Sequence, residues 1–356
     1  MGLLQEILTR ALDNDASDVH IAVGEPPLYR IHTTLQRVAG LPVITAQQAE
    51  EFVKEMVSQQ HFERLETRRD IDFSTELPGL GRFRVNAHYQ KDTIAIAFRA
   101  IPTDVPDVGS LNLPTVVEGF VDLPRGLILI TGETGSGKST TLASLINAMN
   151  QRYDYHVITV EDPVEYDLKS NKCLIEQREL GSDVPDFASG LRHALRQDPD
   201  IILVGEMRDL ETTSAAITAA ETGHLVLSTL HTQNASQTIE RIIDIYPAEQ
   251  QNQIRSMLSN TLQAVVSQVL FRRNDVPGMV PASEVMVCTD AVRNCIRENR
   301  IHEIPNIIET SRAVGMCSLD ESIKGLYFNG MISREQAVAA ATRPESLSRA
   351  ISAEVA

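Results

Sequence analysis

Residues 126–141 read Gly-Leu-Ile-Leu-Ile-Thr-Gly-Glu-Thr-Gly-Ser-Gly-Lys-Ser-Thr-Thr, and this stretch decides the fold. Its first six residues are an almost continuous apolar run, typical of a strand that is covered on both faces of a parallel sheet. The glycines that follow let backbone N–H groups wrap a phosphate, and a helix expected over 138–149 directs its positive N-terminus at the same anion. The order of strand, glycine-rich loop and helix predicts a P-loop for a nucleoside triphosphate.

The loop supplies the first candidate residues. Lys138 is expected to reach the β- and γ-phosphates as a compact charge and to act in catalysis, and the Ser139 hydroxyl is expected to ligate Mg²⁺. The residues predicted to bind the phosphates of ATP or ADP are Gly132, Glu133, Thr134, Gly135, Ser136, Gly137, Lys138, Ser139 and Thr140.

Residues 159–165, Thr-Val-Glu-Asp-Pro-Val-Glu, form a second candidate segment. They follow a predicted buried strand, and the ligands of open α/β sheets bind at the carboxyl ends of the strands. Glu161 is the candidate for polarising an attacking water. Asp162 and Glu165 are candidates for orienting loops or the metal shell, and the alternative is a pair of acidic caps beside a proline turn.

Residues 201–209, Ile-Ile-Leu-Val-Gly-Glu-Met-Arg-Asp, form a third candidate segment. An apolar strand that ends in an acid is typical of a Walker B segment, although Gly205 stands where an aspartate is usual. Glu206 is expected to hold Mg²⁺ through water or to act as the base, so the sequence leaves Glu161 and Glu206 as alternatives for the base. Asp209 is interpreted as the N-cap of the next helix.

Histidines and arginines complete the candidate site. His224 and His231 bracket another apolar strand, and in a sheet that carries a phosphate site they suggest γ-phosphate sensing or contact with a neighbouring subunit. One lysine and one Mg²⁺ rarely neutralise the transition state of phosphoryl transfer, so an arginine is also expected. Arg82, Arg84 and Arg99 lie on strand-like segments, and the first two share a face by two-residue alternation.

The chain divides into segments of different character. Residues 1–101 are predicted to form a small α+β domain that includes a capped helix after Thr45. Residues 102–113 are rich in proline and aspartate and are interpreted as a linker. Residues 114–356 alternate buried strands with helices, which predicts an α/β domain of the doubly wound kind. From Ala248 to the end, helices are expected to dominate.

Composition narrows the classes of function. The formal net charge of −16 opposes broad binding to nucleic acid or anionic lipid and favours a protein partner. No apolar run is long enough to span a bilayer, and the first residues lack a secretory signal. The four cysteines are scattered, which argues against a zinc site or a disulfide framework. These features predict a cytoplasmic protein with no membrane insertion and no nucleic-acid partner.

The motifs together resemble the secretion-ATPase superfamily, and within it the ATPases that retract type IV pili. The match runs over nearly the whole chain. Residues 132–141 resemble the family's Walker A motif, 159–165 its aspartate box, 201–209 its Walker B motif and 222–232 its histidine box. Residues 81–87 resemble its N-terminal arginine strand. Glu133 departs from the pattern, because the family usually has proline there.

Residues 291–298, Ala-Val-Arg-Asn-Cys-Ile-Arg-Glu, are the most discriminating piece of the resemblance. They resemble the AIRNLIRE motif, which marks retraction rather than assembly ATPases. The segment is an amphipathic turn of helix in which Val292, Cys295 and Ile296 are expected to pack. The residues to which the resemblance gives a role are Arg293, Asn294, Arg297 and Glu298.

The resemblance implies a PAS-like first domain and a RecA-like P-loop ATPase domain with a helical C-terminal part. It implies a homohexameric ring with each ATP site between the two domains, approached by Arg82, Arg84 and Arg99, and a hinge at the linker. The ring would act on an inner-membrane pilus platform protein, so attachment to the membrane is peripheral and protein-mediated. Two alternatives stay open at this stage: a pilus-assembly or type II secretion ATPase, and a nucleotide-gated regulatory ring.

Overall fold

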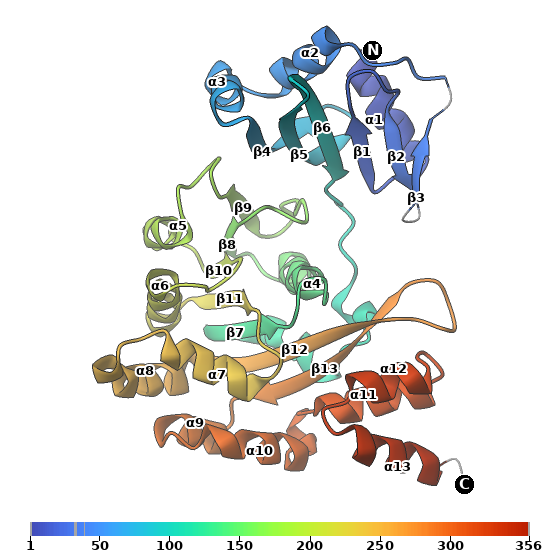
Figure 1. The fold of residues 1–356 in the computed structure, drawn as a ribbon. Coiled ribbons are helices and arrows are strands. Elements are labelled where there is room, and N and C mark those ends of the chain that lie inside the picture. The colour runs from blue at the N-terminus through green and yellow to red at the C-terminus, as the bar shows by residue number, and fades with distance from the viewer. Residues whose placement is uncertain (1, 32–33, 39, 355–356) are drawn as a thin grey trace. The chain divides into compact units, whose positions relative to one another are not determined.

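The structure, a computed structural model, describes residues 2–31, 34–38 and 40–354. The chain divides into two compact units, Met1–Asp104 with Pro163–Asp167, and Val105–Asp162 with Leu168–Ala356 (Figure 1). The boundary near residue 104 falls inside the segment interpreted as a linker, which also carries a short 3₁₀ helix at Val108–Leu111. Pro163–Asp167 lies in the first unit, although the sequence placed it with the ATPase domain.

The first unit is built on a six-stranded antiparallel sheet in the order β3-β2-β1-β6-β5-β4. Apolar side chains alternate along its strands and bury one face against three helices. Thr45 caps the second of these, since its hydroxyl accepts from the N–H of Gln48, as predicted. The elements are α1 (Leu3–Asp13), β1 (Asp18–Ile21), β2 (Leu28–Ile31), β3 (Thr34–Arg37), α2 (Ala46–Met56), α3 (Gln59–Arg68), β4 (Asp70–Leu77), β5 (Gly81–Gln90) and β6 (Thr93–Ala100).

The second unit is built on a seven-stranded sheet in the order β13-β12-β7-β11-β10-β8-β9. All neighbours are parallel except β12 and β13, which confirms the α/β class predicted from the buried apolar runs. The strands are β7 (Gly126–Thr131), β8 (His156–Glu161), β9 (Leu174–Glu179), β10 (Ile201–Val204), β11 (Leu225–Leu230), β12 (Leu262–Arg272) and β13 (Met279–Val287).

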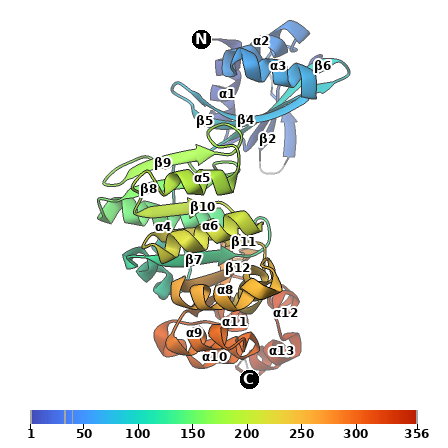
Figure 2. The ribbon, with the colours of Figure 1, turned by 90° about the vertical axis from the view of Figure 1, so that its left-hand side faces the viewer.

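Helices cover both faces of this sheet. One face carries α4 (Lys138–Arg152) with a 3₁₀ helix at Thr115–Asp122, and the other carries α5 (Phe187–Ala194), α6 (Leu210–Glu221), α7 (Ala235–Asp244) and α8 (Ala248–Thr261) (Figures 1 and 2). Asp209 caps α6 through the N–H of Thr212, as predicted. Because both faces are covered, the strands are apolar throughout instead of alternating.

The C-terminal part differs from its prediction. The expectation of helices from Ala248 onward is wrong for β12 and β13, which form a long hairpin and extend the sheet beyond β7. The valine-rich run 262–272 follows a helix directly, and an apolar run without polar alternation does not distinguish strand from helix. Pro281 is tolerated in β13 because this strand lies at the edge of the sheet.

Up to residue 354, where the described part of the chain ends, five short α-helices follow the hairpin. They are α9 (Asp290–Arg297), α10 (Ile304–Thr310), α11 (Leu319–Phe328), α12 (Arg334–Ala340) and α13 (Pro344–Glu354). The first two extend the large core around α7 and α8, whereas the last three enclose a smaller core with Phe271, Val280 and Ala282 of the hairpin. Within the described part of the chain, no helix combines the length and apolarity needed to cross a membrane.

Candidate active site

The predicted phosphate loop connects β7 to α4 as expected, and its glycines are required by its shape. Gly132 has φ of 138°, and a Cβ there would lie 2.3 Å from the carbonyl oxygen of Gln268 in β12. Gly135 and Gly137 have φ of 80° and 90°, the left-handed region that glycine adopts without strain. The loop is therefore held in its curved form by the neighbouring strand.

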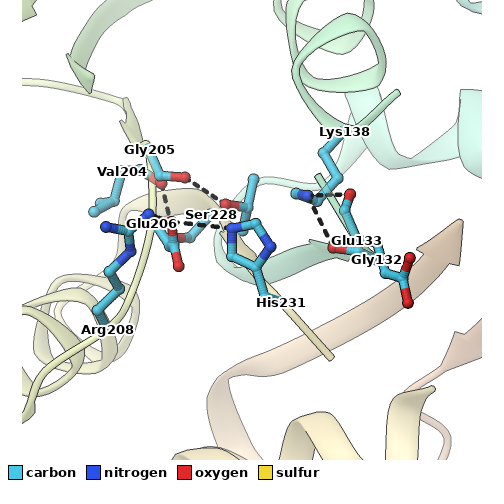
Figure 3. A network of polar contacts seen from close by, with 10 residues as sticks. Gly132, Glu133, Lys138, Val204, Gly205, Glu206, Arg208, Ser228 and His231 are labelled. Atoms are coloured by element: carbon cyan, nitrogen blue, oxygen red, sulfur yellow. Dashed lines mark hydrogen bonds and ion pairs between the residues drawn. The ribbon is translucent and has the colours of Figure 1, made fainter. Parts of the chain in front are cut away.

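Lys138 lies against this loop. Its ammonium donates to the carbonyl oxygens of Gly132 and Glu133, each at 2.8 Å, and the residue is only 8% exposed (Figure 3). Glu133 therefore engages the lysine through its backbone, while its side chain is exposed. These two carbonyl oxygens occupy two of the three N–H donors of the ammonium, so a phosphate that accepts more than one hydrogen bond from Lys138 must displace at least one of them.

The residues of the loop suit a phosphate group. The buried hydroxyl of Ser136 has no hydrogen-bond partner among the described residues, which is costly unless a ligand supplies one. Ser139 lies half-buried in the first turn of α4, where the positive end of the helix favours an anion. The donor set is thus the one expected for the phosphates of a nucleotide.

Glu206 lies beside the phosphate loop, just beyond the end of β10. Its carboxylate is 16% exposed and contacts the Arg208 guanidinium at 2.6 Å and the Nε2 atom of His231 at 3.3 Å (Figure 3). The hydrogen bond with Glu206 raises the pKa of Arg208 above its ordinary value. The structure thus joins two predicted residues, Glu206 and His231, to a third that the sequence did not single out.

Gly205, which stands where an aspartate is usual, lies in a closely packed turn. A Cβ at this position would lie 3.3 Å from both the Val160 carbonyl oxygen and the ring of Phe187. The turn is also fixed by Thr229 of β11, whose hydroxyl donates to the Gly205 carbonyl oxygen at 2.6 Å. A side chain here would require its neighbours to shift by a few tenths of an ångström, and the acid of this segment, Glu206, stands one residue later.

Glu161 ends β8, which is paired in parallel with β10, so it lies on the same edge of the sheet as Glu206. Its carboxylate accepts from the Thr159 hydroxyl at 2.6 Å and from the Gln177 amide at 3.0 Å. Asp162 is exposed and raises the pKa of the nearby Arg208 together with Glu206. Glu165 is exposed and belongs to the first unit, whereas Glu161 and Asp162 belong to the second.

The two histidines lie at opposite ends of β11. His231 follows the carboxyl end, next to the phosphate loop, since the Gly132 N–H donates to the Leu230 carbonyl. His224 precedes the amino end, and its Nδ1 atom lies 2.9 Å from the Ala219 carbonyl oxygen. Six strand residues span about 20 Å, so the structure does not bring His224 to the phosphate loop.

The three predicted arginines share one face of the first unit's sheet. Arg84 and Arg99 are direct partners across β5 and β6, and Arg82 lies two residues before Arg84. Arg99 forms an ion pair with Asp18 at 2.7 Å, and Arg82 donates to the Ser74 hydroxyl at 2.8 Å. The face predicted for Arg82 and Arg84 is confirmed, and the structure adds Arg99 to it. The Arg82 and Arg99 side chains are held by neighbours in their own unit.

Helix α9 carries the segment 291–298. Val292, Cys295 and Ile296 are buried as predicted. Arg293 donates to the carbonyl oxygens of Ser259 and Asn260 at the end of α8, at 2.6 and 3.2 Å, and so caps that helix. The other residues to which the resemblance gave a role are exposed, namely Asn294, Arg297 and Glu298.

Sequence reasoning missed the polar residues of β12. The Thr131 hydroxyl at the end of β7 donates to the Ser267 hydroxyl at 2.8 Å, and the Gln268 amide donates to the Thr141 hydroxyl in α4 at 2.9 Å. Both β12 residues are almost fully buried. The sequence feature that could have identified them is a pair of polar residues inside a valine-rich run. Buried polar side chains need hydrogen-bond partners, so such a pair predicts polar groups on the neighbouring elements.

A phosphate loop between a buried strand and a helix, with acids at the ends of neighbouring parallel strands, defines a P-loop nucleotide hydrolase. The family model described as "Type II/IV secretion system protein" matches residues 1–314, and the chain belongs to that family.

Three relatives illustrate the similarity. The "Type IV pilus retractation ATPase PilT" of Pseudomonas aeruginosa is 44% identical over 96% of this chain and 99% of its own length. The "Twitching motility protein" of Neisseria gonorrhoeae is 42% identical over 98% of this chain and 92% of its own. A crystal structure of the pilus retraction motor PilT with bound ADP matches 97% of this chain and 98% of its own, with a TM-score of 0.90 and 41% identity.

The α9 contacts predict different effects for its two arginines. Arg293→Ala should lower the free energy of unfolding by about 1–3 kcal/mol, because the carbonyls at the end of α8 lose a charged donor. Arg297→Ala is the matched control, since the Arg297 side chain is exposed. It should change the free energy of unfolding by less than about 0.5 kcal/mol. Urea unfolding of both variants measures the two values. Equal effects would contradict the capping role.

Proposed function

We propose that this protein is a motor ATPase that hydrolyses ATP to retract type IV pili. The observation that carries the proposal is the phosphate loop with its buried Lys138 and the adjacent Glu206–His231 contact, in a chain similar over nearly its whole length to retraction ATPases. The bound ADP of the similar crystal structure supports the same nucleotide here. Under this proposal the first unit is PAS-like and the second is RecA-like.

The chemistry of the site is phosphoryl transfer to water. The loop 132–140 binds the phosphates, and Lys138 exchanges its carbonyl partners for phosphate oxygens. Mg²⁺, when bound, neutralises charge on the phosphates; Ser139 and Glu206 are the residues that would hold it. Glu161 is the candidate for polarising the attacking water, because its carboxylate is fixed by two hydrogen bonds at the same edge of the sheet.

His231 and the arginines have supporting roles in this proposal. His231 lies against Glu206 and is placed to respond to the γ-phosphate. Arg82, Arg84 and Arg99 are candidates for neutralising the transition state, because they gather three cations on one sheet face. His224 lies away from the loop, so its proposed role is contact with a neighbouring subunit.

The motor is proposed to work as a homohexamer that acts on an inner-membrane pilus platform protein. Self-assembly is supported by membership of the secretion-system family, and a protein partner by the net charge of −16. Asn294, Arg297 and Glu298 expose polar groups on α9 and are candidates for transmitting motion to that partner. The protein would then be cytoplasmic and peripheral to the membrane through this contact.

Lys138→Ala should lower ATP hydrolysis by about 100-fold or more, because the main cation facing the transferred phosphoryl group is lost. Phosphate release from purified protein with Mg²⁺ measures this. Arg349→Ala is the control, since that side chain is exposed in α13, and should hydrolyse ATP normally.

In the host, loss of the gene should give extra pili and no twitching. Equal turnover of wild type and Lys138→Ala would contradict the ATPase, and cells without pili would favour assembly.

Glu161→Gln and Glu206→Gln separate the two acids. If Glu161 polarises the water, Glu161→Gln should lower kcat by about 100-fold or more without changing the Mg²⁺ requirement. Glu206→Gln should instead raise the Mg²⁺ concentration needed for half-maximal turnover, because a metal-shell carboxylate is lost. Titration of Mg²⁺ at saturating ATP measures both. The reverse pattern would assign the base to Glu206.

A further inference from the structure

Glu284 places a carboxylate in β13, where the packing of the sheet does not require a charged side chain. It lies in β13 directly opposite Ser267 of β12, and Ser267 lies opposite Thr131 of β7. The three polar side chains thus occupy one row across three neighbouring strands, and Thr131 immediately precedes the phosphate loop. Burying a carboxyl group is unfavourable unless it gains a hydrogen bond in return.

The hydrogen bond that Glu284 gains is to the start of α7. Its Oε1 atom accepts from the backbone N–H of Ala235 at 2.8 Å. Ala235 is the first residue of that helix and is fully buried, so water does not reach its N–H group. The first N–H groups of a helix have no partner within it, and a carboxylate there is also favoured by the helix dipole.

The start of α7 is also the end of the loop that carries His231. His231 and Ala235 are separated by three residues. Within the loop, the hydroxyls of Thr232 and Thr238 lie 2.7 Å apart, and the Asn234 side chain accepts from the N–H of Gln237 at 2.9 Å. These contacts are local, whereas Glu284 ties the loop to a strand 49 residues away in sequence.

The surroundings of Glu284 are acidic as well as buried. Burial raises the pKa of its carboxyl above the ordinary value, and Asp320 of α11 raises it further, while the hydrogen bond from Ala235 lowers it. Cys317, whose backbone pairs with Val285, is a further titratable group nearby. An isolated charge is therefore unfavourable at this place, and the Ala235 contact is what offsets the cost.

We propose that Glu284 is a positioning residue for His231. By fixing the N-terminus of α7 it fixes the loop 231–234, and hence the distance between His231 and Glu206 at the phosphate site. Through the Thr131–Ser267 hydrogen bond the same hairpin also contacts the residue that immediately precedes the phosphate loop. The catalytic part of this inference rests on the proposed function, whereas the loop-fixing part does not.

Hydrogen–deuterium exchange of the full-length protein without nucleotide tests the loop-fixing part. Glu284→Ala should speed exchange of peptides that contain residues 231–238 by about tenfold or more, because the Ala235 N–H loses its acceptor. Glu284→Gln keeps an acceptor oxygen, so the same peptides should exchange at close to the wild-type rate. Glu345→Ala, which removes a 94% exposed carboxylate, is the control. Unchanged exchange in Glu284→Ala overturns the proposal, and should that variant not fold, the shorter Glu284→Asp replaces it.

A double-mutant cycle tests whether Glu284 acts through His231. Glu284→Ala should lower kcat for ATP about tenfold with little change in KM, and Glu284→Gln should restore most of it. In a His231→Ala background, Glu284→Ala should have no further effect, because the residue it positions is gone. Additive losses overturn the positioning role and leave a structural cap. If the wild type hydrolyses no ATP, the proposed function fails, and the exchange experiment alone decides whether Glu284 fixes the loop.

Discussion

The site depends on how closely the phosphate loop approaches β12. The Gly132 backbone lies so near the Gln268 carbonyl that even a single carbon added to it would lie only 2.3 Å from that oxygen. This contact fixes where the loop turns, and the Thr131–Ser267 and Thr141–Gln268 hydrogen bonds fix the strand before it and the helix after it. A loop held on three sides is preorganised for an anion, so less of the binding energy is lost in ordering it.

The parallel order of the strands explains why the candidate acids and His231 lie at one edge of the sheet. β12 and β13 lie on one side of β7, and β11, β10 and β8 lie on the other. Parallel strands place their carboxyl ends at one edge, which collects Glu161, Glu206 and His231 beside the loop. His224 shows the converse, since it precedes the amino end of β11 whereas His231 follows the carboxyl end of that strand.

Much of this site could be predicted from the sequence, because its motifs are local. The strand at 126–131, the loop, the strand at 201–204 and the Asp209 cap each follow from a few adjacent residues. The hairpin of β12 and β13 could not, because an apolar run after a helix has no local feature that marks a strand. Gln268 and Glu284 were missed for a related reason: their partners are brought to them by the fold, not by sequence spacing.

The central claim is that the loop 132–139 binds ATP and that Lys138 gives up its own carbonyl partners to do so. A crystal structure with Mg²⁺ and a non-hydrolysable ATP analogue tests this most directly. The expected result places the phosphates in the loop, with the Lys138 ammonium on phosphate oxygens and at least one of the Gly132 and Glu133 carbonyls released. Nucleotide bound elsewhere, or a lysine still bonded to both carbonyls with phosphate in the loop, would contradict it.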